Sequence, residues 1–208
     1  MSLLIAGQSN VPYLARGGRH RRFEVRLGEI DVFWEPASAL GPSAEARDWN
    51  PRPDGDPLTG EILADLLGAL AEAEARGAPI TGLLWVQGEG DRRVPAFTAA
   101  YRDNLGGLAQ RLIDAAGGEL AIVVLMLSAR APVVERLEGF APRTRTLRAA
   151  QAAVAEETPG VRALDPDAVA DRRGVAPGAM FEDGAHYAGA FASALLDAAL
   201  PLLGGGPA

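Results

Sequence analysis

Apolar runs alternate along this chain with stretches in which apolar residues recur every three or four positions. The runs with the length and composition of strands are 3–7, 30–34, 80–86, 120–127 and 161–165. The two longest, "ITGLLWV" and "LAIVVLML", are almost continuously apolar, which is typical of parallel strands buried on both faces. The pattern therefore predicts an α/β fold with a central parallel sheet covered by helices on both sides.

The stretches between these runs predict helices at 60–76, 95–115, 142–157 and 187–203. Glycines mark the ends of the first two, at Gly77 and at Gly117-Gly118. The apolar stripes on these helices are interpreted as core, and their members include Ile62, Leu63, Leu66, Leu67, Leu70, Phe97, Tyr101, Leu105, Leu108, Leu112, Phe191, Leu195, Ala199 and Leu202.

Two stretches, 35–59 and 128–141, carry prolines and glycines without a sustained period and are predicted to be loops. A loop as long as 35–59 is usually functional or mobile. Since neither a repeat nor a linker divides the sequence, we expect a single domain over 1–203 and a flexible tail over 204–208.

Composition and charge narrow the function classes. Hydrophobic residues make up 48% of the 208 residues, and the net charge of −7 gives no electrostatic reason to expect nucleic-acid binding. The basic run "RGGRHRR" at 16–22 is interpreted as a solvated loop. Neither a membrane span nor a signal segment is visible, so we expect a soluble protein, cytoplasmic or part of a larger assembly. A basic set made only of arginine suggests a bacterial protein from a GC-rich genome.

Cysteine and lysine are both absent, and histidine occurs only at His20 and His186. These absences exclude a thiol nucleophile, Schiff-base chemistry and a Ser-Lys dyad. Two widely separated histidines make a poor metal site, so neither a metal nor another cofactor is expected.

Three polar stretches have residue types that suit nucleophilic catalysis. "GQSN" at 7–10 ends the first apolar run, "WVQGEGD" at 85–91 follows the third, and "DGAHYA" at 183–188 precedes the last helix. A serine nucleophile needs an imidazole base and a carboxylate that orients it. Ser9, His186 and Asp183 supply these groups, whereas the arginines around His20 would oppose protonation of its ring. Each stretch read alone is also compatible with an ordinary turn.

The developing oxyanion needs hydrogen-bond donors. The predicted donors are the backbone N–H of Ser9, the side-chain amide of Gln87 and the N–H of Gly60, at the head of the helix predicted over 60–76.

Together the three stretches resemble the motifs of the SGNH-hydrolase superfamily, in particular its sialate O-acetylesterase and acetylxylan-esterase branch. The resemblance implies a flavodoxin-like three-layer α/β/α sandwich and a metal-independent serine esterase that acts on an acetylated carbohydrate through an acetyl-enzyme. It implies that Ser9 is the nucleophile, Asp183 the acid and His186 the base of the triad, with Gln87 in the place of an asparagine oxyanion donor. The other motif positions are interpreted as supporting residues: Gln8, Asn10, Gly88, Glu89 and Asp91.

Two residues depart from the branch pattern, and both weaken the inference about substrate more than the inference about chemistry. Val11 stands where methionine is common, and Gly90 stands where serine is common. Two alternatives stay open: a catalytically silent carbohydrate-binding or assembly module on the same fold, and an esterase or thioesterase for another acyl group, such as a lipid. Self-association is left open as well.

Overall fold

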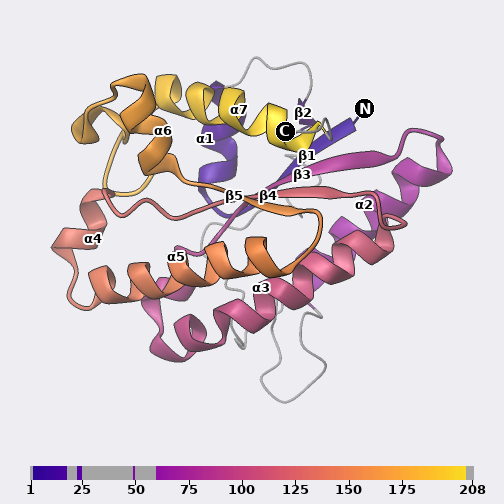
Figure 1. Ribbon diagram of the computed structural model, residues 1–208, viewed down its shortest axis with the longest axis horizontal. Helices are drawn as coiled ribbons and strands as arrows, with labels where there is room; N and C mark the ends of the chain where they lie inside the picture. The colour runs from indigo at the N-terminus through magenta and orange to yellow at the C-terminus, as the bar shows by residue number, and fades with distance from the viewer. Residues whose placement is uncertain (1, 18–22, 25–48, 50–59, 205–208) are drawn as a thin grey trace.

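Across the residues that the computed structural model describes (2–17, 23–24, 49 and 60–204), five parallel strands form a central sheet. Their order is β2-β1-β3-β4-β5 (Figure 1). The bounds are Ser2–Gly7 for β1, Phe23–Glu24 for β2, Ile80–Val86 for β3, Ala121–Leu125 for β4 and Val161–Leu164 for β5.

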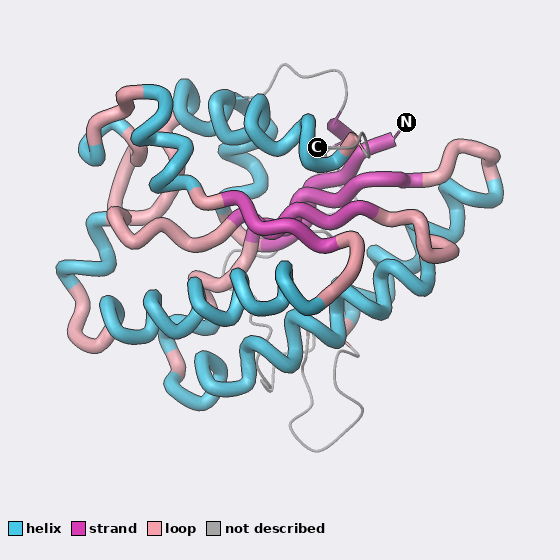
Figure 2. Tube along the Cα trace, viewed as in Figure 1, coloured by secondary structure: helices cyan, strands magenta, loops and turns pink. Residues whose placement is uncertain are grey.

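Helices cover both faces of this sheet, which gives three layers (Figure 2). On one face lie α2 (Glu61–Ala75), α3 (Pro95–Ala115) and α5 (Phe140–Glu157). On the other lie α1 (Asn10–Gly17), α6 (Pro166–Arg173) and α7 (Gly189–Leu203). Shorter elements connect them: α4 (Pro132–Arg136) and the single-turn 3₁₀ helices η2 (Asp91–Arg93) and η3 (Pro177–Ala179).

Two apolar cores fill the spaces between these layers, and β3 contributes to both. Leu83 and Trp85 belong to the core beneath α2, α3 and α5, whereas Leu84 and Val86 belong to the core beneath α1 and α7. This is why β3 is apolar at nearly every position, since alternate side chains enter opposite cores. Trp49 is fully buried and packs edge-on against Trp85, with ring centroids 4.7 Å apart. Trp49 is therefore a core residue.

The hydrophobic pattern locates most of these elements. The predicted strand 80–86 and the predicted helix 95–115 are confirmed with their bounds, and β4 ends two residues before its predicted end. The predicted strand 30–34, and the predicted loop 35–59 apart from Trp49, lie outside the described residues.

Three helices were not predicted from the sequence. α1 and α6 have only eight residues each, and α4 has five and lies inside the predicted loop 128–141. Such short helices show too few turns for a period to be recognised. α4 and α6 each begin with a proline, which is a favoured first residue of a helix.

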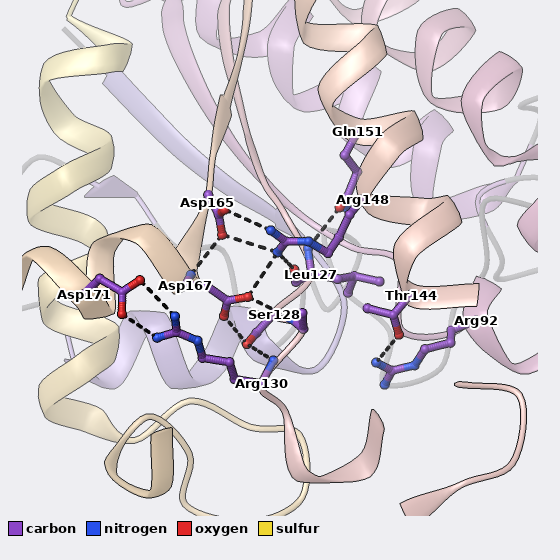
Figure 3. Close-up of polar contacts among 11 residues, drawn as sticks. Arg92, Leu127, Ser128, Arg130, Thr144, Arg148, Gln151, Asp165, Asp167 and Asp171 are labelled. Carbon is purple, nitrogen blue, oxygen red and sulfur yellow. Dashed lines mark hydrogen bonds and ion pairs between the residues drawn. The ribbon is translucent and has the colours of Figure 1, made fainter. Parts of the chain in front are cut away.

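A charged cluster joins the carboxyl ends of β4 and β5 to α5 and α6 (Figure 3). The Arg148 guanidinium, from α5, donates to both carboxylate oxygens of Asp165, at 2.9 and 3.3 Å, and to the Leu127 carbonyl. It also lies 3.4 Å from an oxygen of Asp167, which accepts hydrogen bonds from the Ser128 hydroxyl and the Ala129 N–H. Arg148 thus holds two neighbouring carboxylates next to each other.

Replacing Arg148 with methionine is expected to destabilise the protein by about 2–3 kcal/mol, because two partly buried carboxylates lose their shared cation. The matched control is Arg102→Met, which breaks an ion pair with Glu157 whose two side chains are 55% and 56% exposed. The control should cost less than about 1 kcal/mol, since exposed ion pairs contribute little. Urea unfolding of both variants measures the difference, and equal losses would contradict this role of Arg148.

Candidate active site

The carboxyl ends of β1 and β3 meet where the order of the sheet reverses. β2 pairs with one side of β1 and β3 with the other, so the connections after β1 and β3 diverge at this point. Ser9 follows β1 by two residues, and Gln87 follows β3 directly. Doubly wound sheets bind their ligands at such a switch point.

Gly7 makes the sharp exit from β1 possible. Its φ is +142°, and a Cβ atom at this position would lie 1.9 Å from the carbonyl oxygen of Val86. Only glycine fits such a close approach at that φ. The N–H of Gln8 then donates to this same carbonyl at 2.7 Å, and the chain enters α1 at Asn10. Ser9 is left in the turn between strand and helix.

Ser9, His186 and Asp183 form one hydrogen-bonded chain. Nε2 of His186 lies 3.0 Å from Oγ of Ser9, and Nδ1 of His186 lies 2.7 Å from Oδ2 of Asp183. A carboxylate only accepts hydrogen bonds, so this network assigns the ring proton to Nδ1 and leaves Nε2 to accept from the Ser9 hydroxyl. This is the arrangement of nucleophile, base and orienting acid in serine hydrolases.

The spacing of "DGAH" follows from the local turn. Oδ1 of Asp183 accepts the N–H groups of Ala185 at 2.7 Å and His186 at 2.8 Å, which leaves Oδ2 for the imidazole. Backbone hydrogen bonds close the base of this loop, from Glu182 N–H to His186 C=O and from Ala188 N–H to Met180 C=O. One carboxylate therefore both shapes the turn and orients the ring.

Asn10 and Gln8 connect the three motif stretches. Nδ2 of Asn10 donates to Oε1 of Glu89 at 2.8 Å and to the Ala185 carbonyl at 3.3 Å. Oδ1 of Asn10 accepts the Tyr187 N–H at 3.0 Å.

Gln8 joins the loop after β1 to the loop after β3. Oε1 of Gln8 accepts the N–H groups of Gly88 and Gly90, at 2.9 and 3.2 Å. The segments that carry Ser9, Gln87 and His186 are thereby held to one another.

Comparison with solved structures shows which proteins share this fold. A member of the lipolytic G-D-S-L protein family from Veillonella parvula aligns over 97% of both chains with a TM-score of 0.58 at 11% identity. The catalytic domain of the peptidoglycan O-acetyltransferase OatA from Streptococcus pneumoniae covers 97% of this chain and 92% of its own, with a TM-score of 0.59 at 9% identity. A catalytic mutant of an acetylxylan esterase from Geobacillus stearothermophilus covers 98% of this chain and 94% of its own, with a TM-score of 0.53 at 13% identity.

The chain has the SGNH-hydrolase fold. Neither the protein-family models nor the curated proteins gave a match to its sequence. At such low identities the structural likeness concerns the fold, and the chemistry has to be argued from the side chains.

At the Asp183 end of this hydrogen-bonded chain, burial on its own would raise the pKa of the carboxyl. Hydrogen bonds from the His186 ring, from the His186 N–H and from the Ala185 N–H outweigh that effect and lower the pKa to about 2. Asp183 is therefore ionised throughout the pH range in which an imidazole titrates.

Between about pH 4 and pH 8, kcat/KM for ester hydrolysis is expected to fall as the pH is lowered. The logarithm of kcat/KM should have a slope of one against pH, because a single group, the imidazole, takes up a proton. Because the pKa of Asp183 is lower in the folded protein than in the unfolded chain, its negative charge stabilises the fold. This contribution to stability is complete above the unfolded-state pKa and is lost as the pH falls through about 2. A pH–rate profile of kcat/KM measures this. A second ionisation between about pH 3 and pH 5 would contradict the ionisation state assigned to Asp183.

Gln87 lies at the SGNH switch point, but its amide is engaged with Asp91. Both side chains are buried, and Nε2 of Gln87 donates to Oδ2 of Asp91. A primary amide nitrogen has a second hydrogen to donate. The structure thus shows Asp91 holding the amide, and the oxyanion role of Gln87 stays a prediction.

Gly60 precedes α2 as its N-cap, and its N–H donates to the Trp49 carbonyl at 3.3 Å. A role as oxyanion donor would require this N–H to be shared with or released from Trp49. The role of Gly60 stays a prediction as well.

Sequence reasoning did not find three residues that support this site. The ring of Tyr13 stacks on His186. At the carboxyl end of β3, the buried Tyr101 hydroxyl donates to the Gln87 carbonyl at 3.0 Å. Nε2 of Gln151 donates to the same carbonyl at 3.1 Å. Tyr101 was predicted only as core from its place in an apolar stripe. No pattern in the sequence points to Gln151, because its partners lie on other elements.

Among the described residues, no group of three or more His, Asp or Glu side chains is arranged to hold a metal ion. The same part of the chain has no helix with the length and apolar character needed to cross a membrane.

Proposed function

We propose that this chain is a serine esterase that removes O-acetyl groups from a carbohydrate. The observation that carries the proposal is the hydrogen-bonded chain from Ser9 through His186 to Asp183, with 3.0 Å between Oγ and Nε2. That distance is within reach for direct proton transfer.

In the acylation half, Oγ of Ser9 attacks the acetyl carbonyl carbon while its proton passes to Nε2 of His186. When the tetrahedral intermediate collapses, the bond from the acetyl carbon to the sugar oxygen breaks. The imidazolium gives its proton to that oxygen, so the sugar leaves as an alcohol and the acetyl group stays on Ser9. Asp183 stays ionised and stabilises the imidazolium through Nδ1.

In the deacylation half, a water molecule gives one proton to Nε2 of His186 and attacks the acetyl-Ser9 carbonyl. The ester bond to Oγ breaks and Ser9 recovers its proton from the imidazolium. Acetic acid leaves and becomes acetate by losing its proton to the solvent. The same base therefore serves both halves, and the enzyme returns to its starting protonation state.

Charge on the tetrahedral oxygen would be stabilised by the Ser9 N–H and by the side-chain amide of Gln87, with Gly60 as a third donor. The amino-terminal end of α1 begins directly after Ser9 and adds partial positive charge there. The hydrogen bond from Gln87 to Asp91 supports this role, because a held amide does not need to reorganise during the reaction.

The carbohydrate acetyl ester is favoured by the resemblance of the three motifs to the sialate O-acetylesterase and acetylxylan-esterase branch. It is consistent with the names of two proteins of similar fold, an acetylxylan esterase and a peptidoglycan O-acetyltransferase.

The test is acetate release from acetylated xylan and from an O-acetylated sialic acid, together with p-nitrophenyl acetate, butyrate and octanoate. Acetate release and a preference for acetyl over butyryl of about tenfold or more are expected, since one or two methylenes change pocket binding by that order. A preference for the longer chains would overturn the acetyl assignment in favour of a lipid ester or thioester. Glycan binding without turnover of any ester would instead favour a silent binding module.

A further inference from the structure

A tyrosine ring covers one face of the proposed base. Tyr13 and His186 have ring centroids 4.5 Å apart and planes only 11° from parallel. Tyr13 lies on α1, four residues after Ser9, and is half-buried. Its neighbours Val11 and Leu14 are fully buried against the sheet, so the helix that presents the ring is firmly packed.

The stack and the hydrogen bonds act on the imidazole in different directions. Hydrogen bonds to Ser9 and Asp183 lie in the plane of the ring and engage its two nitrogens. A ring stacked face-on leaves the in-plane hydrogen bonds of both nitrogens in place and restricts motion out of that plane. Together these contacts hold the imidazole in one orientation, with Nε2 directed at Oγ.

We propose that Tyr13 is a positioning residue, whose aromatic face keeps His186 in line between Ser9 and Asp183 and stabilises the imidazolium formed during attack. This inference rests on the proposed function, because it assigns His186 the role of base. An aromatic face attracts a cation, so the contact is stronger when the ring is charged than when it is neutral.

Charged groups in the neighbouring segments also affect the stability of the imidazolium. Asp183 contacts Nδ1 directly, and Glu182 lies next to Asp183 in the same loop. From the loop after β3, Glu89 reaches this segment through Asn10, which also bonds the Ala185 carbonyl. None of these hydrogen bonds involves Tyr13, so a substitution of Tyr13 removes the aromatic ring and none of these carboxylates.

The test compares Tyr13→Phe, which keeps the ring, with Tyr13→Leu and Tyr13→Gln, which lack it. The ring-free variants are expected to lose about three- to tenfold in kcat with little change in KM, and Tyr13→Phe should retain most of the activity.

An NMR spectrum of the His186 ring gives a second readout that needs no substrate. The chain has only two histidines, so a His20→Gln background leaves one imidazole to follow. We expect the imidazole protons to lose their ring-current displacement in Tyr13→Leu and Tyr13→Gln and to keep it in Tyr13→Phe. Imidazole proton shifts that stay unchanged in both ring-free variants, or an equal loss of kcat in Tyr13→Phe, would overturn the inference. Absence of esterase activity in a wild type whose imidazole protons show the ring-current displacement would overturn the proposed function and leave the stack standing.

Discussion

Alanine in place of Ser9 is expected to lower kcat for acetyl-ester hydrolysis by about four to six orders of magnitude, because no other group can carry the acyl intermediate. The effect should be on kcat more than on KM, since binding of the substrate does not require the hydroxyl. Stopped assays of acetate release at high enzyme concentration measure the remaining rate.

The change removes one oxygen and leaves the turn after β1 intact, so the folded state should be retained. Ser193→Ala is the matched control. It removes a helix hydroxyl that bonds to the Gly189 carbonyl at 3.1 Å, and it should leave activity unchanged. A Ser9→Ala enzyme within about tenfold of the wild type would refute covalent catalysis by this residue.

The second large effect is expected at Gly7, where alanine should destabilise the fold by about 4 kcal/mol or more, enough to unfold much of the population. The added Cβ would lie 1.9 Å from the Val86 oxygen and 2.4 Å from its carbon. Both are backbone atoms at the carboxyl end of β3, where it pairs with β1, so neither can move aside without separating the two strands. Guanidinium unfolding followed by tryptophan fluorescence measures the loss, since Trp49 and Trp85 are buried in the core.

Gly68→Ala provides the opposite case within the same protein. Gly68 lies exposed within α2, and a Cβ there has nothing within 4 Å. Alanine at that position should stabilise the protein by about 0.5–1 kcal/mol through helix propensity. Gly7→Ala with the stability of the wild type would show that β1 ends in a looser turn than the structure indicates.

The layered fold could be predicted because its main elements have strong periods. β3 alternates its side chains between two buried cores, which makes it apolar at nearly every position, and α3 repeats its apolar stripe over about four turns. The short helices α1 and α6 could not be predicted from the sequence, because each has too few apolar residues to show a period. A few side chains of each pack into the core on one face of the sheet.

The candidate site was predictable only as a set of residue types. Order and spacing indicate Ser9, Asp183 and His186, and the turn geometry explains why Asp183 stands three positions before the ring that it orients. The stack of Tyr13 on His186 could not be predicted, since 173 positions separate the two residues and no motif in the sequence marks Tyr13. Nor does sequence show that the amide of Gln87 is held by Asp91.

The most direct measurement of the central claim is covalent labelling by an organophosphorus esterase inhibitor, read by intact mass and peptide mapping. One adduct per chain is expected, on Ser9, and it should form at least about a hundredfold more slowly in His186→Gln because the hydroxyl has lost its base. An adduct on another serine, or labelling of Ser9 at the same rate without the imidazole, would contradict it.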